Sequence, residues 1–177
     1  MEAIVLLKRI RWLIFIFIVG LVLSGATAIP LETEMKLLVR LTHGDGDAGG
    51  VVGTGSGGLA GWLNKVRNGL VEMNARYPFL AYGTDWLAFA HFVIALAFVG
   101  PWREPVRNVW VIEFGMLACV LVVPYALVLG GVREIPWGWR LLDCSFGVLG
   151  FVPLWICRRL IQRLSALNAG HSVPPTG

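Results

Sequence analysis

The stretch VWVIEFGMLACVLVVPYALVLGGV, residues 109–132, holds one charged side chain, Glu113, among its 24 residues. A helix needs roughly 20 mainly apolar residues to cross about 30 Å of hydrocarbon, so this stretch predicts a membrane span. Similar, somewhat shorter apolar stretches are Trp12–Ile29, Trp86–Trp102 and Leu141–Cys157. Because lipid offers the backbone no hydrogen-bond partners, each crossing must be helical.

The four stretches predict an all-α fold, an integral membrane four-helix bundle that forms a single domain over residues 1–177. An amphipathic helix and a Gly-rich loop are expected between the first two spans, on the extracytoplasmic side. The predicted spans are about 12–29, 85–101, 109–130 and 138–157, and the predicted extracytoplasmic segment is about 30–82.

Composition supports a membrane protein. Hydrophobic residues make up 56% of the 177 residues, and the mean hydropathy is +0.71. These values exclude an ordinary soluble domain and a disordered chain. The net charge of +4 would suggest nucleic acid in a soluble protein. Here the positive residues flank apolar stretches, where they meet lipid headgroups. We therefore expect membrane lipid as a partner, consider other membrane-protein subunits, and expect no nucleic acid.

The basic residues beside the spans predict the orientation of the chain. They form three groups: Lys8, Arg9 and Arg11; Arg103 and Arg107; Arg158, Arg159 and Arg163. Four spans place all three groups on one side, and the positive-inside rule then puts both termini in the cytoplasm. An alternative is that residues 1–28 are a signal peptide cleaved after Ala26-Thr27-Ala28. We favour a retained span, because the apolar run is long for a signal peptide.

The segment between the first two spans predicts two surface helices and a loop. Pro30 and the acidic residues after it suit the start of a short helix. Residues 44–58 contain eight glycines and predict a flexible loop. Gly53-x-Gly55-x-x-Gly58 within it lacks the βαβ context of a dinucleotide site, and the calcium-like start Asp45-Gly46-Asp47 lacks the Glu that such a loop requires. After the loop, apolar residues at helical spacing predict an amphipathic helix from Leu59 to about Met73.

Ionisable residues inside spans are candidates for function. A rise of 1.5 Å per residue places Asp85, His91 and Asp143 toward the outer ends of their spans, where they can meet. Arg140 precedes Asp143 by three residues on the same helix face, so Arg140 or Arg133 is expected to neutralise Asp143. The group has two interpretations: a structural polar network, or a site for a proton, haem, chlorophyll or quinone. Haem held by two histidines would need a second intramembrane His, and no other span contains one.

Glu113 lies near the inner end of its span, away from the outer group. Arg103 and Arg107 are its nearest basic neighbours in sequence, so the pattern predicts an inner ion pair that fixes the short turn before residue 109. Cys119, Cys144 and Cys157 all fall in apolar stretches without metal-ligand spacing. Because no catalytic, nucleotide or zinc motif is present either, we predict no catalytic residue, no metal and no cofactor.

Several blocks resemble a group of small, uncharacterised bacterial integral membrane proteins. The blocks are Ser24–Glu32, Tyr82–His91, Gly100–Trp110 and Trp139–Gly147. The resemblance implies a location in the bacterial inner membrane and no particular activity. We therefore expect a non-enzymatic accessory, scaffold or assembly subunit of an inner-membrane complex. The alternative is a small redox or proton/ion-transport protein that uses His91, Asp85 and Asp143.

Overall fold

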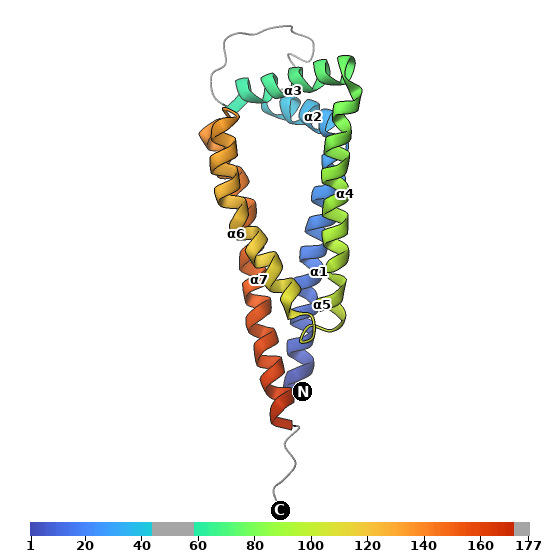
Figure 1. Cartoon of the computed structure of the whole chain (residues 1–177), viewed down its shortest axis with the longest axis vertical. Helices are drawn as coiled ribbons and strands as arrows, with labels where there is room; N and C mark the ends of the chain where they lie inside the picture. Colours follow the sequence, from blue (N-terminus) through green and yellow to red (C-terminus); the bar gives the residue numbers. More distant parts are fainter. Residues whose placement is uncertain (44–58, 172–177) are drawn as a thin grey trace, which may run out of the picture. The chain divides into compact units, whose positions relative to one another are not determined.

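The computed structural model describes residues 1–43 and 59–171, and their regular structure is entirely helical (Figure 1). The Gly-rich loop predicted at 44–58, with its dinucleotide-like and calcium-like patterns, lies outside the described residues. The helices are α1 (Glu2–Ala28), α2 (Leu31–His43), α3 (Leu59–Arg76), the 3-10 helix η2 (Pro78–Ala81), α4 (Tyr82–Ala97), α5 (Val99–Arg103), α6 (Val109–Val132) and α7 (Trp137–His171).

Three helical stretches are long and apolar enough to cross a membrane: Pro78–Arg103, Val109–Val132 and Trp137–Ala169. The pair formed by α1 and Leu31–Val39 of α2 is a fourth candidate, with an 88° bend between its two helices. The prediction of an all-helical chain with several potential spans is therefore confirmed. The helices extend beyond the predicted spans, most clearly in α7, because a helix does not need to end where the hydrocarbon ends.

The described chain forms two compact units. The first unit, called the terminal unit below, combines residues 1–21 with residues 93–171. The second, called the central unit, consists of the described part of residues 22–92. The helices α1 and α4 each contribute residues to both units.

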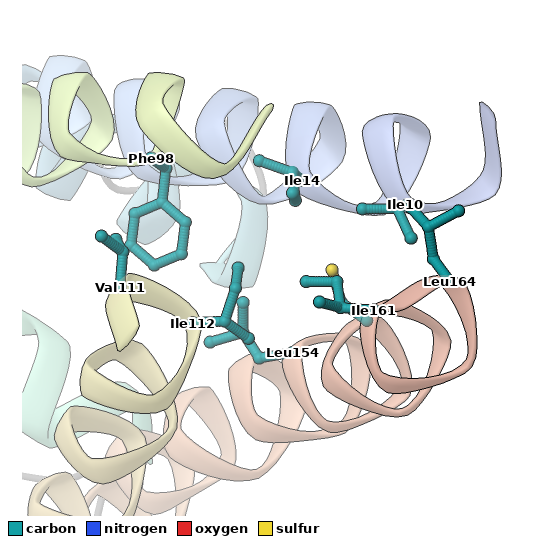
Figure 2. Packing of buried hydrophobic residues seen from close by; sticks show 9 residues of the cluster. Ile10, Ile14, Phe98, Val111, Ile112, Leu154, Ile161 and Leu164 are labelled. Atoms are coloured by element: carbon teal, nitrogen blue, oxygen red, sulfur yellow. The ribbon is translucent and has the colours of Figure 1, made fainter. Parts of the chain in front are cut away.

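The terminal unit has an apolar core built from both ends of the sequence. Ile10 and Ile14 of α1 are fully buried against residues of α6 and α7, including Ile112 and Leu154 (Figure 2). The ring of Phe98 is also fully buried, and its centroid lies 4.7 Å from that of Phe17. Burying a large apolar side chain contributes about 1.5–3 kcal/mol in water. In lipid the same contacts act through close packing, because the tails are as apolar as the side chains.

Helices α6 and α7 lie side by side and are joined by a short turn (Figure 1). A Cβ atom on Gly147 would lie 2.5 Å from the backbone oxygen of Cys119, so glycine permits the close approach of the two helices. The turn is a Schellman motif, in which the amide of Ile135 donates to the Gly130 carbonyl at 2.8 Å. Glu134 has φ of 56°, the left-handed region that usually holds glycine in this motif.

The central unit pairs α2 with α3, which lie side by side in Figure 1. Met35 and Val39 of α2 and Leu63 of α3 are buried. The Asn74 side-chain amide donates to the Glu32 carboxylate at 2.7 Å, and Lys36 also pairs with Glu32. The predicted helix after Pro30 and the predicted amphipathic helix after the Gly-rich loop are thus both present as helices.

Candidate functional site

His91 lies in the central unit, where α4 passes close to the end of α1. A Cβ atom on Gly25 would lie 2.9 Å from the Ala88 backbone oxygen and 3.0 Å from the Cβ of His91. The Nδ1 of His91 is 2.8 Å from the Leu87 carbonyl oxygen. A carbonyl only accepts, so this contact requires a proton on Nδ1 and leaves the Nε2 lone pair of the neutral ring available. Asp85 is exposed on the same helix.

Asp143 lies in the terminal unit, half-buried on α7. Its carboxylate makes no hydrogen bond or ion pair with any residue that the structure describes. Neither Arg140 nor Arg133 forms an ion pair with it among the described residues, so their predicted neutralisation of Asp143 stays a prediction. Arg140 instead donates from Nε to the Ile135 carbonyl at 2.6 Å.

The reason lies in the turn between α6 and α7. The Arg140 side chain packs against Gly130, whose Cβ position would be 2.9 Å from Arg140 Cγ. Its guanidinium carbon is also 5.7 Å from the centre of the Trp137 ring, in a cation–π contact. Arg140 therefore stabilises the turn, and its charge is directed away from Asp143. The sequence predicts that the polar residues of the outer group lie close together. Two of them, Asp85 and His91, belong to the central unit, and the other two, Asp143 and Arg140, belong to the terminal unit, so this proximity stays a prediction.

Glu113 pairs with a different arginine from those predicted. Arg158 Nε donates to Glu113 Oε1 at 2.8 Å, across the α6–α7 interface. Arg107 contacts Glu104 at 3.3 Å in the preceding turn, and Arg103 forms no ion pair among the described residues. Among the described residues, Glu113 thus pairs with Arg158 and with neither Arg103 nor Arg107. Antiparallel packing of α6 on α7 brings the start of α6 to the second half of α7, where Arg158 lies.

Arg11 joins α1 to α5 at the same end of the terminal unit. Its Nε donates to the Trp102 carbonyl at 3.2 Å, and an Nη group donates to the Arg103 carbonyl at 3.5 Å. The last carbonyls of a helix have no partner within the helix, so Arg11 caps the end of α5. Its guanidinium carbon also lies 5.8 Å from the centre of the Trp102 ring.

The three basic groups of the sequence gather at this end. A shallow groove there is lined by Ala3, Ile4 and Leu7 of α1, by residues 103–107, and by Leu164 and Asn168 of α7. The first turns of α1, the α5–α6 connection and the last turns of α7 therefore form this groove together. We call this region the basic end of the terminal unit.

Sequence reasoning missed Arg11 as a capping residue and Arg158 as the partner of Glu113. A signal for Arg158 was present, because Glu113 near the start of one span and Arg158 at the end of the next face each other in an antiparallel pair. No sequence signal marks the carbonyls that Arg11 binds. In residues 1–43 and 59–171, no group of three or more His, Cys, Asp or Glu side chains is arranged to hold a metal ion.

Comparison of the chain with protein-family models, curated proteins and solved structures finds no match.

Proposed function

We propose that this chain is a non-enzymatic accessory, scaffold or assembly subunit of a complex in a bacterial inner membrane. The observation that carries the proposal is that the rest of the chain buries only a small part of each candidate span. Only 17% to 22% of the apolar windows of the three candidate spans is buried. A small membrane protein with such open helices has most of its surface available for lipid and for the helices of other subunits.

The exposed surfaces include large aromatic side chains on each span. Phe89 of α4, Phe114 of α6 and Phe146 of α7 are between 51% and 63% exposed. Aromatic residues are enriched at the centres of protein interfaces because they bury large areas at a low cost in conformational entropy. These three positions therefore test three different helices for a partner.

We further propose a four-helix membrane bundle with both termini in the cytoplasm. The gathering of three basic groups at one end of the terminal unit supports this orientation, because the positive-inside rule places such groups on the cytoplasmic side. The 88° bend between α1 and α2 supports a placement of α2 and α3 along the outer surface of the membrane. Their amphipathic sequences suit that position.

The test is photo-crosslinking of the full chain in bacterial membranes. The crosslinker p-benzoylphenylalanine replaces Phe89, Phe114 or Phe146, one position at a time. A subunit interface gives one discrete heterologous product from one or two positions, and the remaining position serves as the control. A chain that contacts lipid alone gives no protein product from any position and migrates as a monomer in native electrophoresis, which overturns the proposal.

A second function has specific support, namely a redox or proton/ion-transport role that uses His91, Asp85 and Asp143. The available Nε2 of His91 could hold a ligand, since ligating histidines commonly donate their other ring N–H to a carbonyl. The unpaired carboxylate of Asp143 could carry a proton or ion. Purified chain would then show visible absorbance that His91→Ala removes, or transport that Asp143→Asn abolishes without loss of insertion.

A further inference from the structure

A second groove lies at the basic end of the terminal unit, on the outer face of α1. It has a volume of about 330 Å³ and is lined by Lys8, Arg11, Trp12, Phe15 and Trp102. The four residues from α1 follow the spacing i, i+3, i+4 and i+7, which places them on one face of the helix. The two cations come first along that face and the two aromatic rings follow.

The cationic end of the groove has no counter-charge. Lys8 makes no hydrogen bond or ion pair within the part of the chain that the structure describes, and no acidic residue lines the groove. Arg11 uses Nε and one Nη group on the carbonyls of α5. A guanidinium has five N–H donors, so further donors remain available beside the Lys8 ammonium.

The other end of the groove is apolar and open. Trp12 is 64% exposed and Phe15 is 46% exposed, although the two rings contact each other edge to face with centroids 5.7 Å apart. The axial distance from Lys8 to Phe15 is about 10 Å at 1.5 Å per residue. A ligand that fits the groove therefore carries negative charge at one end, followed by an apolar chain, over a length of about 10 Å along the helix axis.

We propose that this groove binds one anionic phospholipid. The phosphate contacts Lys8 and the free donors of Arg11, and an acyl chain lies along Trp12 and Phe15. Zwitterionic lipids carry the same phosphate together with a positive group, which reduces their attraction to two adjacent cations. The site is independent of the partner-binding role proposed above, because it requires only the end of α1 at the membrane surface.

The test is native mass spectrometry of the full chain in detergent, titrated with phosphatidylglycerol or with phosphatidylcholine of the same acyl chains. The wild type is expected to bind one phosphatidylglycerol more tightly than it binds phosphatidylcholine. Lys8→Gln is expected to weaken phosphatidylglycerol binding about five-fold, given the contribution of one basic residue near a lipid surface. The matched control is Arg9→Gln, which removes the same charge from the next residue, outside the groove lining.

Two further measurements test the contributions of the acyl chain and of the phosphate separately. Trp12→Ala should weaken both lipids by a similar factor, because it removes the contact with the chain and leaves the cations. Inorganic phosphate at millimolar concentration should not displace the lipid, because it cannot occupy the apolar end. Arg11→Gln also removes the cap on α5, so Lys8→Gln carries the test of charge recognition.

Three results would overturn the site. The first is equal affinity of the wild type for the two lipids. The second is an equal loss of binding in Arg9→Gln and Lys8→Gln, which would show attraction to the whole basic end and no local site. The third is displacement of the lipid by phosphate alone.

Discussion

At the residue scale, Glu113 and Arg158 show how an ion pair can join the two neighbouring helices α6 and α7. Their side chains are 48% and 36% exposed, so the chain itself covers neither of them fully. Exposed ion pairs contribute about 0.2–1 kcal/mol, and the charge-assisted hydrogen bond at 2.8 Å favours the upper part of that range. The pair therefore sets the register of α6 on α7 more than it sets total stability.

A double-mutant cycle tests this pair. Glu113→Gln and Arg158→Gln should each lower the free energy of unfolding in detergent by up to about 1 kcal/mol, and the double variant should lose less than their sum. The measurement is denaturant unfolding followed by circular dichroism. Glu104→Gln combined with Arg158→Gln is the control, because Glu104 contacts Arg107. Strict additivity of Glu113→Gln with Arg158→Gln would contradict the pairing.

The sequence predicted the positions of the helices better than it predicted the partners of individual side chains. Apolar stretches and Pro30 predicted the positions of the helices, because length and hydropathy determine them locally. The partners of Glu113 and Arg140 depend on which helices pack together and on how the α6–α7 turn is built. Arg140 binds a backbone carbonyl, and every residue has one, so its partner cannot be identified from residue types.

At the element scale, the end of α6 carries backbone strain at Glu134. A residue with a Cβ atom in the left-handed region costs roughly 1–2 kcal/mol relative to the right-handed region, and glycine avoids this cost. Glycine relieves this strain, but it also gives the unfolded chain more conformational entropy, which offsets part of the gain. We therefore expect Glu134→Gly to raise the free energy of unfolding by about 0.5–1 kcal/mol. Arg133→Gly is the control: Arg133 has φ of −93°, so glycine there should destabilise. The measurement is thermal unfolding of both variants, and a loss in Glu134→Gly would count against the Schellman geometry.

The α2–α3 pair, at the same scale, should respond to acid through Glu32. Hydrogen bonds from Lys36 and then from Asn74 lower the pKa of Glu32 from its ordinary value of 4.5. A carboxyl with a lowered pKa in the folded state stabilises that state fully above the unfolded value, and this contribution is lost as the pH falls through the folded value. Wild type should therefore lose stability below about pH 4.5 in a way that Glu32→Gln does not.

The control for that experiment is Glu34→Gln, which removes one carboxylate from the same helical turn. Glu34 makes no side-chain hydrogen bond or ion pair in the described ranges. Thermal unfolding at several pH values between 3 and 6 should show the wild-type pH dependence in Glu34→Gln. If Glu32→Gln retains the full acid response, the interactions of Glu32 are not its source.

At the scale of the whole molecule, the main physical feature is apolar surface that faces outward. Water cannot cover such surfaces stably, so the chain should be recovered with membranes and should aggregate when detergent is removed. The proposed orientation adds a sharper expectation. Single cysteines at Val106 and Gln162, in a background without the three native cysteines, should both face the cytoplasm, and one at Val71 should face outward.

The measurement is reaction with a membrane-impermeant maleimide in intact spheroplasts and in lysed membranes. Val106→Cys and Gln162→Cys should react only after lysis, whereas Val71→Cys should react before it. All three positions are exposed and none carries a charge, so the basic groups that govern orientation remain intact. If Val106→Cys and Gln162→Cys reacted from opposite sides, the chain could not cross the membrane an even number of times between these positions. That result would contradict the proposal that both termini lie in the cytoplasm.

The core of the terminal unit also has a consequence for the order of synthesis. Ile10 and Ile14 leave the ribosome early, but Leu154 and Ile161, which complete their cluster, follow roughly 150 residues later, on the order of ten seconds at typical translation rates. In the proposed membrane bundle, the first helix would then stay in the bilayer without its final neighbours during that interval. The stretch from Trp12 to Ile29 carries no charge, so lipid tails can surround it at little cost until the C-terminal helix arrives.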